Sequence, residues 1–218
     1  MKNLFTLAIA AIFSMASLAQ NKEGSIVYTM NIDGLPPEAA AMMQGMETRI
    51  FVKGDKTKSE VVNPFSTTIS ISDNKTKDVV TLMDIMGQKY MIKSKIEEPT
   101  TDKNGKPEIK IKKLNDSKTI AGYKCKNAEV SVKDKKSGES HTSIVWYTTE
   151  AGLGYEASFN GLGGLPLEYE MKRDGRKIQM SCKSVSFDKV PDSTFDIPEG
   201  YTETTQAELE QMFKGMGK

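Results

Sequence analysis

Histidine and tryptophan occur once each in this sequence of 218 residues, and cysteine occurs only twice. A single histidine excludes metal sites built from several imidazoles, including every His-x-x-x-His motif. The two cysteines do not form a Cys-x-x-Cys pair, and the chain has no Gly-x-Ser-x-Gly motif. Lysine and arginine number 30 against 29 aspartates and glutamates, which gives no overall charge that favours nucleic acid. We expect no catalytic activity, metal or cofactor.

The N-terminal residues 1–19 have the order of a secretory signal peptide. Lys2 precedes an apolar run that ends at Ala16, and small residues follow it. Cleavage is expected between Ala19 and Gln20, where no nearby cysteine could carry a lipid anchor. The alternative is a membrane anchor, but the run is shorter than the ~20 apolar residues that span a bilayer. We expect residues 20–218 to form one domain without a transmembrane segment, in the periplasm or outside the cell.

Both cysteines, Cys125 and Cys182, lie in the mature part of the chain. An oxidising compartment favours a disulfide between them, and we expect that bridge. The alternative is a pair of separate thiols buried in a strand-rich core.

Alternation of apolar and polar residues dominates the mature chain and predicts β-strands. Strands are expected over residues 26–32, 48–53, 57–62, 68–72, 78–83, 88–92, 108–112, 123–132, 142–147, 165–171 and 178–182. Turn sequences such as Gly54-Asp55 and Asp73-Asn74 separate them, so successive strands form antiparallel hairpins. A change of face near Val185 predicts a β-bulge or a bend where the sheet curves. The expected fold is mainly β (α+β): a curved antiparallel sheet or incomplete barrel with short helices that plug it.

Two segments break the alternation and show helical spacing instead. Their apolar stripes are Ala39, Met42, Met43 and Met46, after a pair of prolines, and Leu209, Met212, Phe213 and Met216, near the C-terminus. One interpretation is that both helices pack on the sheet as ordinary core. The other is that one of them is a mobile cover over a hydrophobic cavity, since methionine adapts to varied apolar ligands.

Three polar or aromatic features have structural interpretations beside functional ones. His141 lies in a polar hairpin, where we expect it to be solvent-exposed, and Trp146 lies in an apolar run that predicts core packing. Residues 101–140 hold eleven lysines against six acidic residues. That excess either covers a solvated strand face and guards sheet edges or approaches anionic lipid head groups and other envelope surfaces.

Four ordered segments carry a family resemblance. They are Thr119-Ile-Ala-Gly-Tyr-Lys-Cys125, Val145-Trp-Tyr147, Gly163-Gly-Leu-Pro-Leu-Glu-Tyr169 and Phe195-Asp-Ile-Pro-Glu-Gly-Tyr201. In this order they resemble a family of secreted bacterial envelope proteins, a domain of unknown function related to the GLPGLI-type proteins. The resemblance implies a fold similar to the LolA/LolB lipoprotein carriers, in which an antiparallel sheet curls into an incomplete barrel and helices plug its open side.

These observations lead to a functional hypothesis: a non-enzymatic domain that binds an apolar or lipid-like ligand in a half-barrel. The candidate ligand-binding residues are Met42, Met43, Met46, Trp146, Leu165, Leu167, Tyr169, Met171, Met212 and Phe213. The alternative is an envelope structural or protein-interaction module without a small ligand, whose partner is another envelope protein. The sequence leaves the oligomeric state and the identity of the ligand open.

Overall fold

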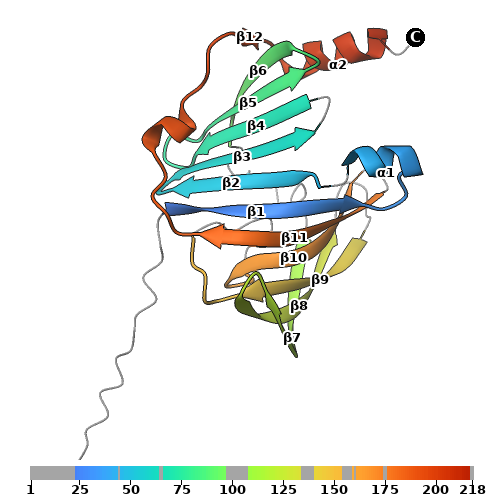
Figure 1. Cartoon of the computed structure of the whole chain (residues 1–218), viewed down its shortest axis with the longest axis vertical. Coiled ribbons are helices and arrows are strands. Elements are labelled where there is room, and N and C mark those ends of the chain that lie inside the picture. The colour runs from blue at the N-terminus through green and yellow to red at the C-terminus, as the bar shows by residue number, and fades with distance from the viewer. Residues whose placement is uncertain are drawn as a thin grey trace, which may run out of the picture.

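The alternating segments of the sequence join into one twelve-stranded sheet (Figure 1). The computed structural model describes residues 23–43, 45–63, 66–96, 108–133, 140–153, 159, 161–173 and 176–216. The strands are β1 (Glu23–Ile32), β2 (Glu47–Lys53), β3 (Lys56–Asn63), β4 (Ser66–Asp73), β5 (Asp78–Ile85), β6 (Gln88–Lys95), β7 (Glu108–Ile120), β8 (Tyr123–Lys133), β9 (Ser140–Thr148), β10 (Leu165–Arg173), β11 (Arg176–Ser186) and β12 (Thr202–Glu203). Their order is β12-β6-β5-β4-β3-β2-β1-β11-β10-β9-β8-β7, and every pairing is antiparallel except the short one between β12 and β6. The predicted fold class, a curved and unclosed sheet that is mainly β, is confirmed.

One core cluster shows which way the sheet curves. Side chains from β2 and from β8, which lie far apart in the strand order, belong to the same buried cluster. Because strands so far apart can meet only inside a curve, this cluster lies on the concave face, and we call it the inner core. It contains Ile26, Tyr28, Ile50, Val52, Cys125, Ala128, Val130, Val145, Tyr147, Ala151, Leu153, Phe159, Leu162, Leu165, Leu167, Tyr169, Met180 and Cys182.

Register shifts accompany the curvature. The pairing of β1 with β11 shifts between Val27 and Tyr28, and that of β10 with β9 shifts between Pro166 and Glu168. Such bulges bend a strand and increase its twist, and a bulge also tolerates the proline. The Tyr28 hydroxyl donates a 2.7 Å hydrogen bond to the Pro166 carbonyl, so the two irregular sites are joined across β11. The change of face predicted near Val185 corresponds to the first of these shifts.

The convex face has a smaller cluster of its own, the outer core. It joins Ile71 of β4 and Leu82 of β5 to Val190 and to Phe195, which ends the 3₁₀ helix η1 (Asp192–Phe195).

The concave face of β3 to β6 differs from the convex face in the burial of its side chains. Cross-strand register places Ser59, Ser70 and Thr81 in one row beside Ile50 of the inner core. Among the described residues of β3 to β6, every side chain on the concave face is half-buried or exposed.

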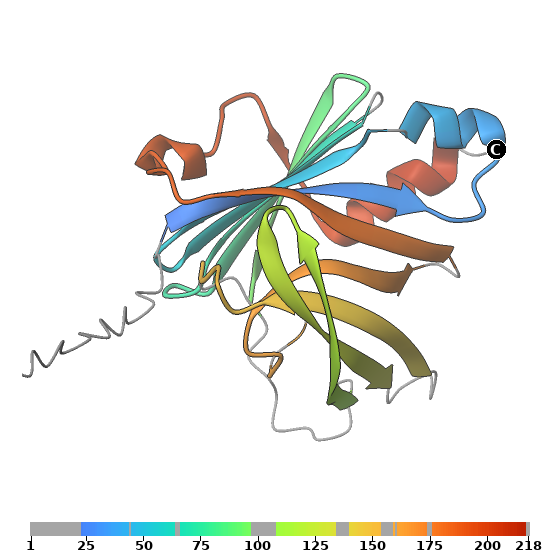
Figure 2. The same cartoon turned by 60° about the horizontal axis from the view of Figure 1, so that its bottom comes forward.

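Two α-helices lie at the same end of the sheet, α1 (Pro37–Met43) and α2 (Gln206–Met216). The helix predicted through Met46 ends earlier, at Met43, because Gly45 adopts a left-handed conformation with φ of 82°. Met46 therefore leads into β2, where it is buried and its carbonyl accepts the Met30 amide. In Figure 2, α1 and η1 stand on one side of β1 and strands β7 to β10 on the other.

Candidate functional site

The described structure has a pocket where α1 approaches the ends of β1 and β11. Its volume is ≈ 540 Å³, within the range typical of small-molecule sites. The lining residues are Thr29, Met30, Asn31, Ile32, Leu35, Ala40, Ala41, Met43, Gly45, Gln179 and Ser181. We call this space the α1 pocket. Of the predicted ligand-binding residues, Met43 lines it.

The α1 pocket has an apolar wall and a polar floor. The wall comes from α1 and the turn before it, chiefly Leu35, Ala40, Ala41 and Met43. The floor comes from the convex face of the sheet, where Thr29 lies opposite Ser181 and Asn31 lies opposite Gln179 across the β1–β11 ladder. The site therefore has one surface for an apolar chain and one for hydrogen-bonding groups.

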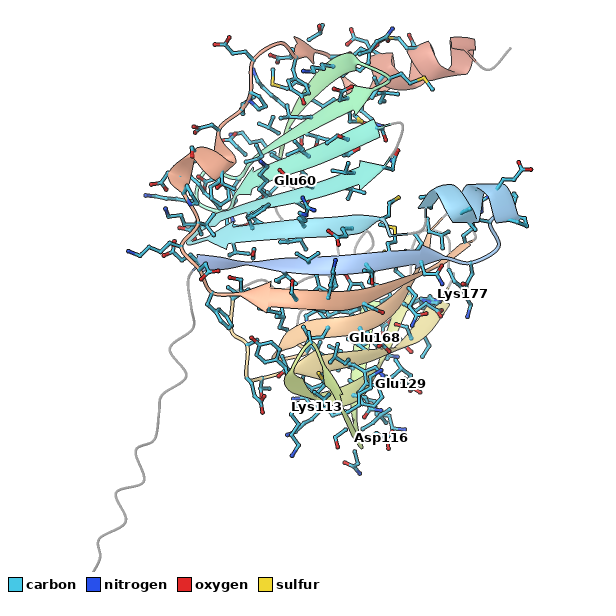
Figure 3. All side chains as sticks on the ribbon, viewed as in Figure 1. Glu60, Lys113, Asp116, Glu129, Glu168 and Lys177 are labelled. Atoms are coloured by element: carbon cyan, nitrogen blue, oxygen red, sulfur yellow. The ribbon has the colours of Figure 1, made fainter. Side chains whose placement is uncertain are left out.

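Ion pairs flank the polar floor along β11. The Lys177 ammonium lies 3.2 Å from a Glu170 carboxylate oxygen, and the Lys183 ammonium lies 2.6 Å from a Glu47 carboxylate oxygen. Figure 3 shows Lys177 at the end of the sheet next to α1. The hydrogen bonds from Lys183 and then from Arg49 lower the pKa of Glu47, so this carboxylate stays ionised beside its lysine.

A second pocket, of ≈ 510 Å³, lies between α2 and the β6–β12 edge. Tyr90 and Met212 supply its apolar surface, together with polar side chains that include Glu203 and Glu208. Both carboxylates already have partners. The Lys93 ammonium lies 2.7 Å from a Glu203 carboxylate oxygen, and the Thr205 hydroxyl donates a hydrogen bond to a Glu208 carboxylate oxygen. The predicted residue Met212 lines this pocket and not the first one.

Most other predicted ligand-binding residues belong to the inner core. Leu165, Leu167 and Tyr169 are buried there, and Tyr169 packs edge-on against Tyr28 and Phe159. Met171 and Trp146 are half-buried against the same cluster. The side chains of Met42 and Phe213, and the predicted cleavage site at Ala19 and Gln20, lie outside the described residues. The closed part of the half-barrel is thus filled by the protein's own side chains.

Trp146 contacts a charged pair on the sheet. The Lys118 ammonium lies 4.4 Å from the centre of the indole ring and 2.6 Å from a Glu168 carboxylate oxygen. Figure 3 labels Glu168 on β10. The lysine is neutralised by Glu168 and stacks on Trp146, so this part of the lysine-rich segment forms a paired strand face.

The single histidine is half-buried, so the expectation of a solvent-exposed side chain is wrong. Its hairpin continues into β9, where His141 pairs with Val132, and its Nε2 lies 3.8 Å from a Glu170 carboxylate oxygen. That nitrogen is buried and has no hydrogen-bond partner among the described residues. Within the described residues, no group of three or more histidine, cysteine, aspartate or glutamate side chains is arranged to hold a metal ion.

The two cysteines are free thiols in the structure, so the predicted disulfide is absent from it. Cys125 and Cys182 are both buried in the inner core, and each sulfur lies near a carbonyl of its own strand, at 3.4 Å and 3.5 Å. Burial raises the pKa of both thiols, that of Cys182 to about 11. The alternative interpretation of buried thiols that pack as small apolar residues fits this arrangement.

The polar floor was missed at the sequence level. Asn31 and Gln179 occupy the polar positions of alternating strands, a pattern that predicts an ordinary solvent-facing side chain. Only the long-range pairing of β1 with β11 brings them together. A signal in the sequence was the proline-initiated helix that begins at Pro37, a short turn after Ile32, and that returns the chain over that strand end.

Comparison with known proteins places the chain in a family. In the part of the chain that the structure describes, no helix is long and apolar enough to cross a membrane. No curated protein sequence matches the chain. Among solved structures it is similar to LprF from Mycobacterium bovis, with 13% identity and a TM-score of 0.34, over 84% of this chain and 92% of that one. A likeness this remote carries no functional argument. The profile of one sequence family matches residues 23–159, and the chain therefore belongs to the family described as "Domain of unknown function (DUF4412)".

Proposed function

We propose that this protein is a non-enzymatic, secreted or periplasmic domain that binds an apolar or lipid-like molecule. The observation that supports the proposal is the α1 pocket of ≈ 540 Å³, with its apolar wall of Leu35, Ala40, Ala41 and Met43. The space proposed for the ligand lies under α1 against the convex face of the sheet, whereas the inner core fills the curve between β2 and β8.

The character of the wall supports an apolar occupant. Met43 and Met30 both line the pocket, and flexible thioether side chains adapt to ligands of varied shape. Leu35 and Met43 are only half-buried. A ligand that covered them would remove further apolar surface from water, and this burial would stabilise the complex by roughly 25 cal/mol for each Å².

Pocket-filling variants test the proposal. Native mass spectrometry after gentle purification, with displacement of an environment-sensitive apolar dye, measures binding by the unmodified protein. Ala41→Trp places an indole in the α1 pocket, and Ala207→Trp places the same side chain on an exposed position of α2 that lines neither pocket. We expect Ala41→Trp to weaken dye binding at least about tenfold and Ala207→Trp to leave it unchanged. No ligand adduct and no dye uptake by the unmodified protein would refute the proposal.

A second candidate function is a protein-interaction module, and one observation favours it. The concave face of β3 to β6 carries a row of small, half-buried residues that includes Ser59, Ser70 and Thr81, without a fully buried side chain among the described residues there. A partner protein could cover this face. An arginine introduced by Ser70→Arg should then abolish recovery of a stoichiometric partner from envelope extract, whereas recovery of no partner by the unmodified protein counts against this function.

A further inference from the structure

The polar floor of the α1 pocket indicates which head group a ligand would carry. Thr29, Ser181, Asn31 and Gln179 form a two-by-two patch on neighbouring strands, with directly opposite partners in register. All four side chains are uncharged and carry hydrogen-bonding groups. An amphipathic molecule whose chain lies against Leu35 and Met43 would therefore place its head on hydroxyl and amide groups.

The floor has unused hydrogen-bonding capacity. Within the described residues, the side-chain amides of Asn31 and Gln179 have no hydrogen-bond partner, and both side chains are exposed to solvent. Each amide offers two donors and one acceptor oxygen. The Thr29 hydroxyl donates to the Ser181 carbonyl at 3.2 Å, so its oxygen still has room to accept. Together these groups can both donate to and accept from a ligand hydroxyl.

The two lysines beside the floor are already compensated. Lys177 and Lys183 stand at either end of the Gln179–Ser181 stretch on the same face of β11, and each is paired with a carboxylate, Glu170 or Glu47. Asp33 follows β1 and Arg176 begins β11, and neither of these two charged residues lines the pocket. An anionic head would find no unpaired lysine on the floor and would exchange its hydration for neutral groups.

From this arrangement we propose that the α1 pocket selects neutral amphipaths with one alkyl chain and a polyhydroxyl head, such as a monoacylglycerol or an alkyl glycoside, over anionic fatty acids. The inference rests on the proposed function and names the ligand class of the same site. The alkyl chain lies on the α1 wall, and the head hydroxyls bond to Asn31 and Gln179.

Ligands with the same twelve-carbon chain and different heads test the selectivity. We expect 1-monododecanoylglycerol to displace the apolar dye at a concentration about tenfold lower than dodecanoate at pH 7.5, with little change between low and high salt. Equal or tighter binding of dodecanoate overturns the inference. Failure of the dye to bind at all refutes the proposed function instead, so the two failures are distinguishable.

Variants of the floor assign the selectivity to its residues. The double variant Asn31→Leu with Gln179→Leu keeps side-chain size and removes the amides, whereas Asn31→Gln with Gln179→Asn keeps them. The first should lose most of the preference for the glycerol head while retaining dye binding, and the second should retain that preference. An unchanged preference in the leucine variant overturns the inference. Should that variant fail to fold, the head-group comparison on the unmodified protein still decides the outcome.

Discussion

The hydrogen bond between Tyr28 and Pro166 gives a sharp test of how the sheet is held in its curve. Tyr28 is fully buried, and its hydroxyl reaches across β11 to the carbonyl of Pro166 at 2.7 Å. Tyr28→Phe keeps the ring that packs edge-on against Tyr169 and removes only the hydroxyl. A buried carbonyl that loses its donor costs about 1–3 kcal/mol in unfolding free energy.

Thermal and urea unfolding measure this effect. A loss of about 2 kcal/mol corresponds to a Tm lowered by ~4–8 °C in a chain of this size, with the urea m-value unchanged. The matched control is Tyr90→Phe, whose hydroxyl donates to Gln88 at the surface, at 2.6 Å. We expect the control to change the unfolding free energy by less than about 0.5 kcal/mol. Equal stabilities of the Tyr28→Phe and Tyr90→Phe variants would refute the role given to this bond.

Three further predictions concern the cysteines, the C-terminal helix and a tight strand contact. Because Cys182 is buried with a pKa of about 11, an alkylating agent at pH 8 should leave the folded protein unlabelled and add to both cysteines after unfolding without reductant; labelling only after reduction would show a disulfide. Hydrogen bonds from Thr205 and Thr204 lower the pKa of Glu208 below 4.5, so its contribution to α2 is complete above pH 4.5 and is lost as the pH falls through the folded-state pKa. The protection factors of the α2 amides should therefore fall on acidification more than in the variant Glu208→Gln, and an identical pH profile would contradict this. A Cβ on Gly164 would lie 2.5 Å from the Thr148 carbonyl oxygen, so Gly164→Ala should destabilise by about 1–3 kcal/mol in urea unfolding, and a neutral effect would show that β9 and β10 can move apart.

The strands were predictable because their signal is local. Tyr28 and Met30 alternate with the polar residues Thr29 and Asn31, and both contribute to the inner core or pack against it. The extent of the first helix was harder, since the spacing of Met46 suits a helix whereas the left-handed Gly45 ends it. A periodic pattern reports which residues share a face, but the backbone conformation of one glycine decides where that pattern stops.

The candidate site was less predictable than the fold. Leu165, Leu167 and Tyr169 have the alternation of a strand with one apolar face, and the sequence does not say whether that face lines a cavity or fills it. In the structure the aromatic rings of Tyr28, Tyr169 and Phe159 close the interior. The polar floor depends on register between segments from opposite ends of the chain, which no local pattern contains.

Methionine methyl NMR during a ligand titration tests the central claim most directly. Met30 and Met43 line the α1 pocket, whereas Met91 packs against the outer core and Met86 is 80% exposed. Adding 1-monododecanoylglycerol to protein labelled with ¹³C at its methionine methyl groups should shift the signals of Met30 and Met43 and leave those of Met86 and Met91 in place. Unmoved signals from Met30 and Met43, or shifts confined to Met212 in the second pocket, would contradict a ligand site under α1.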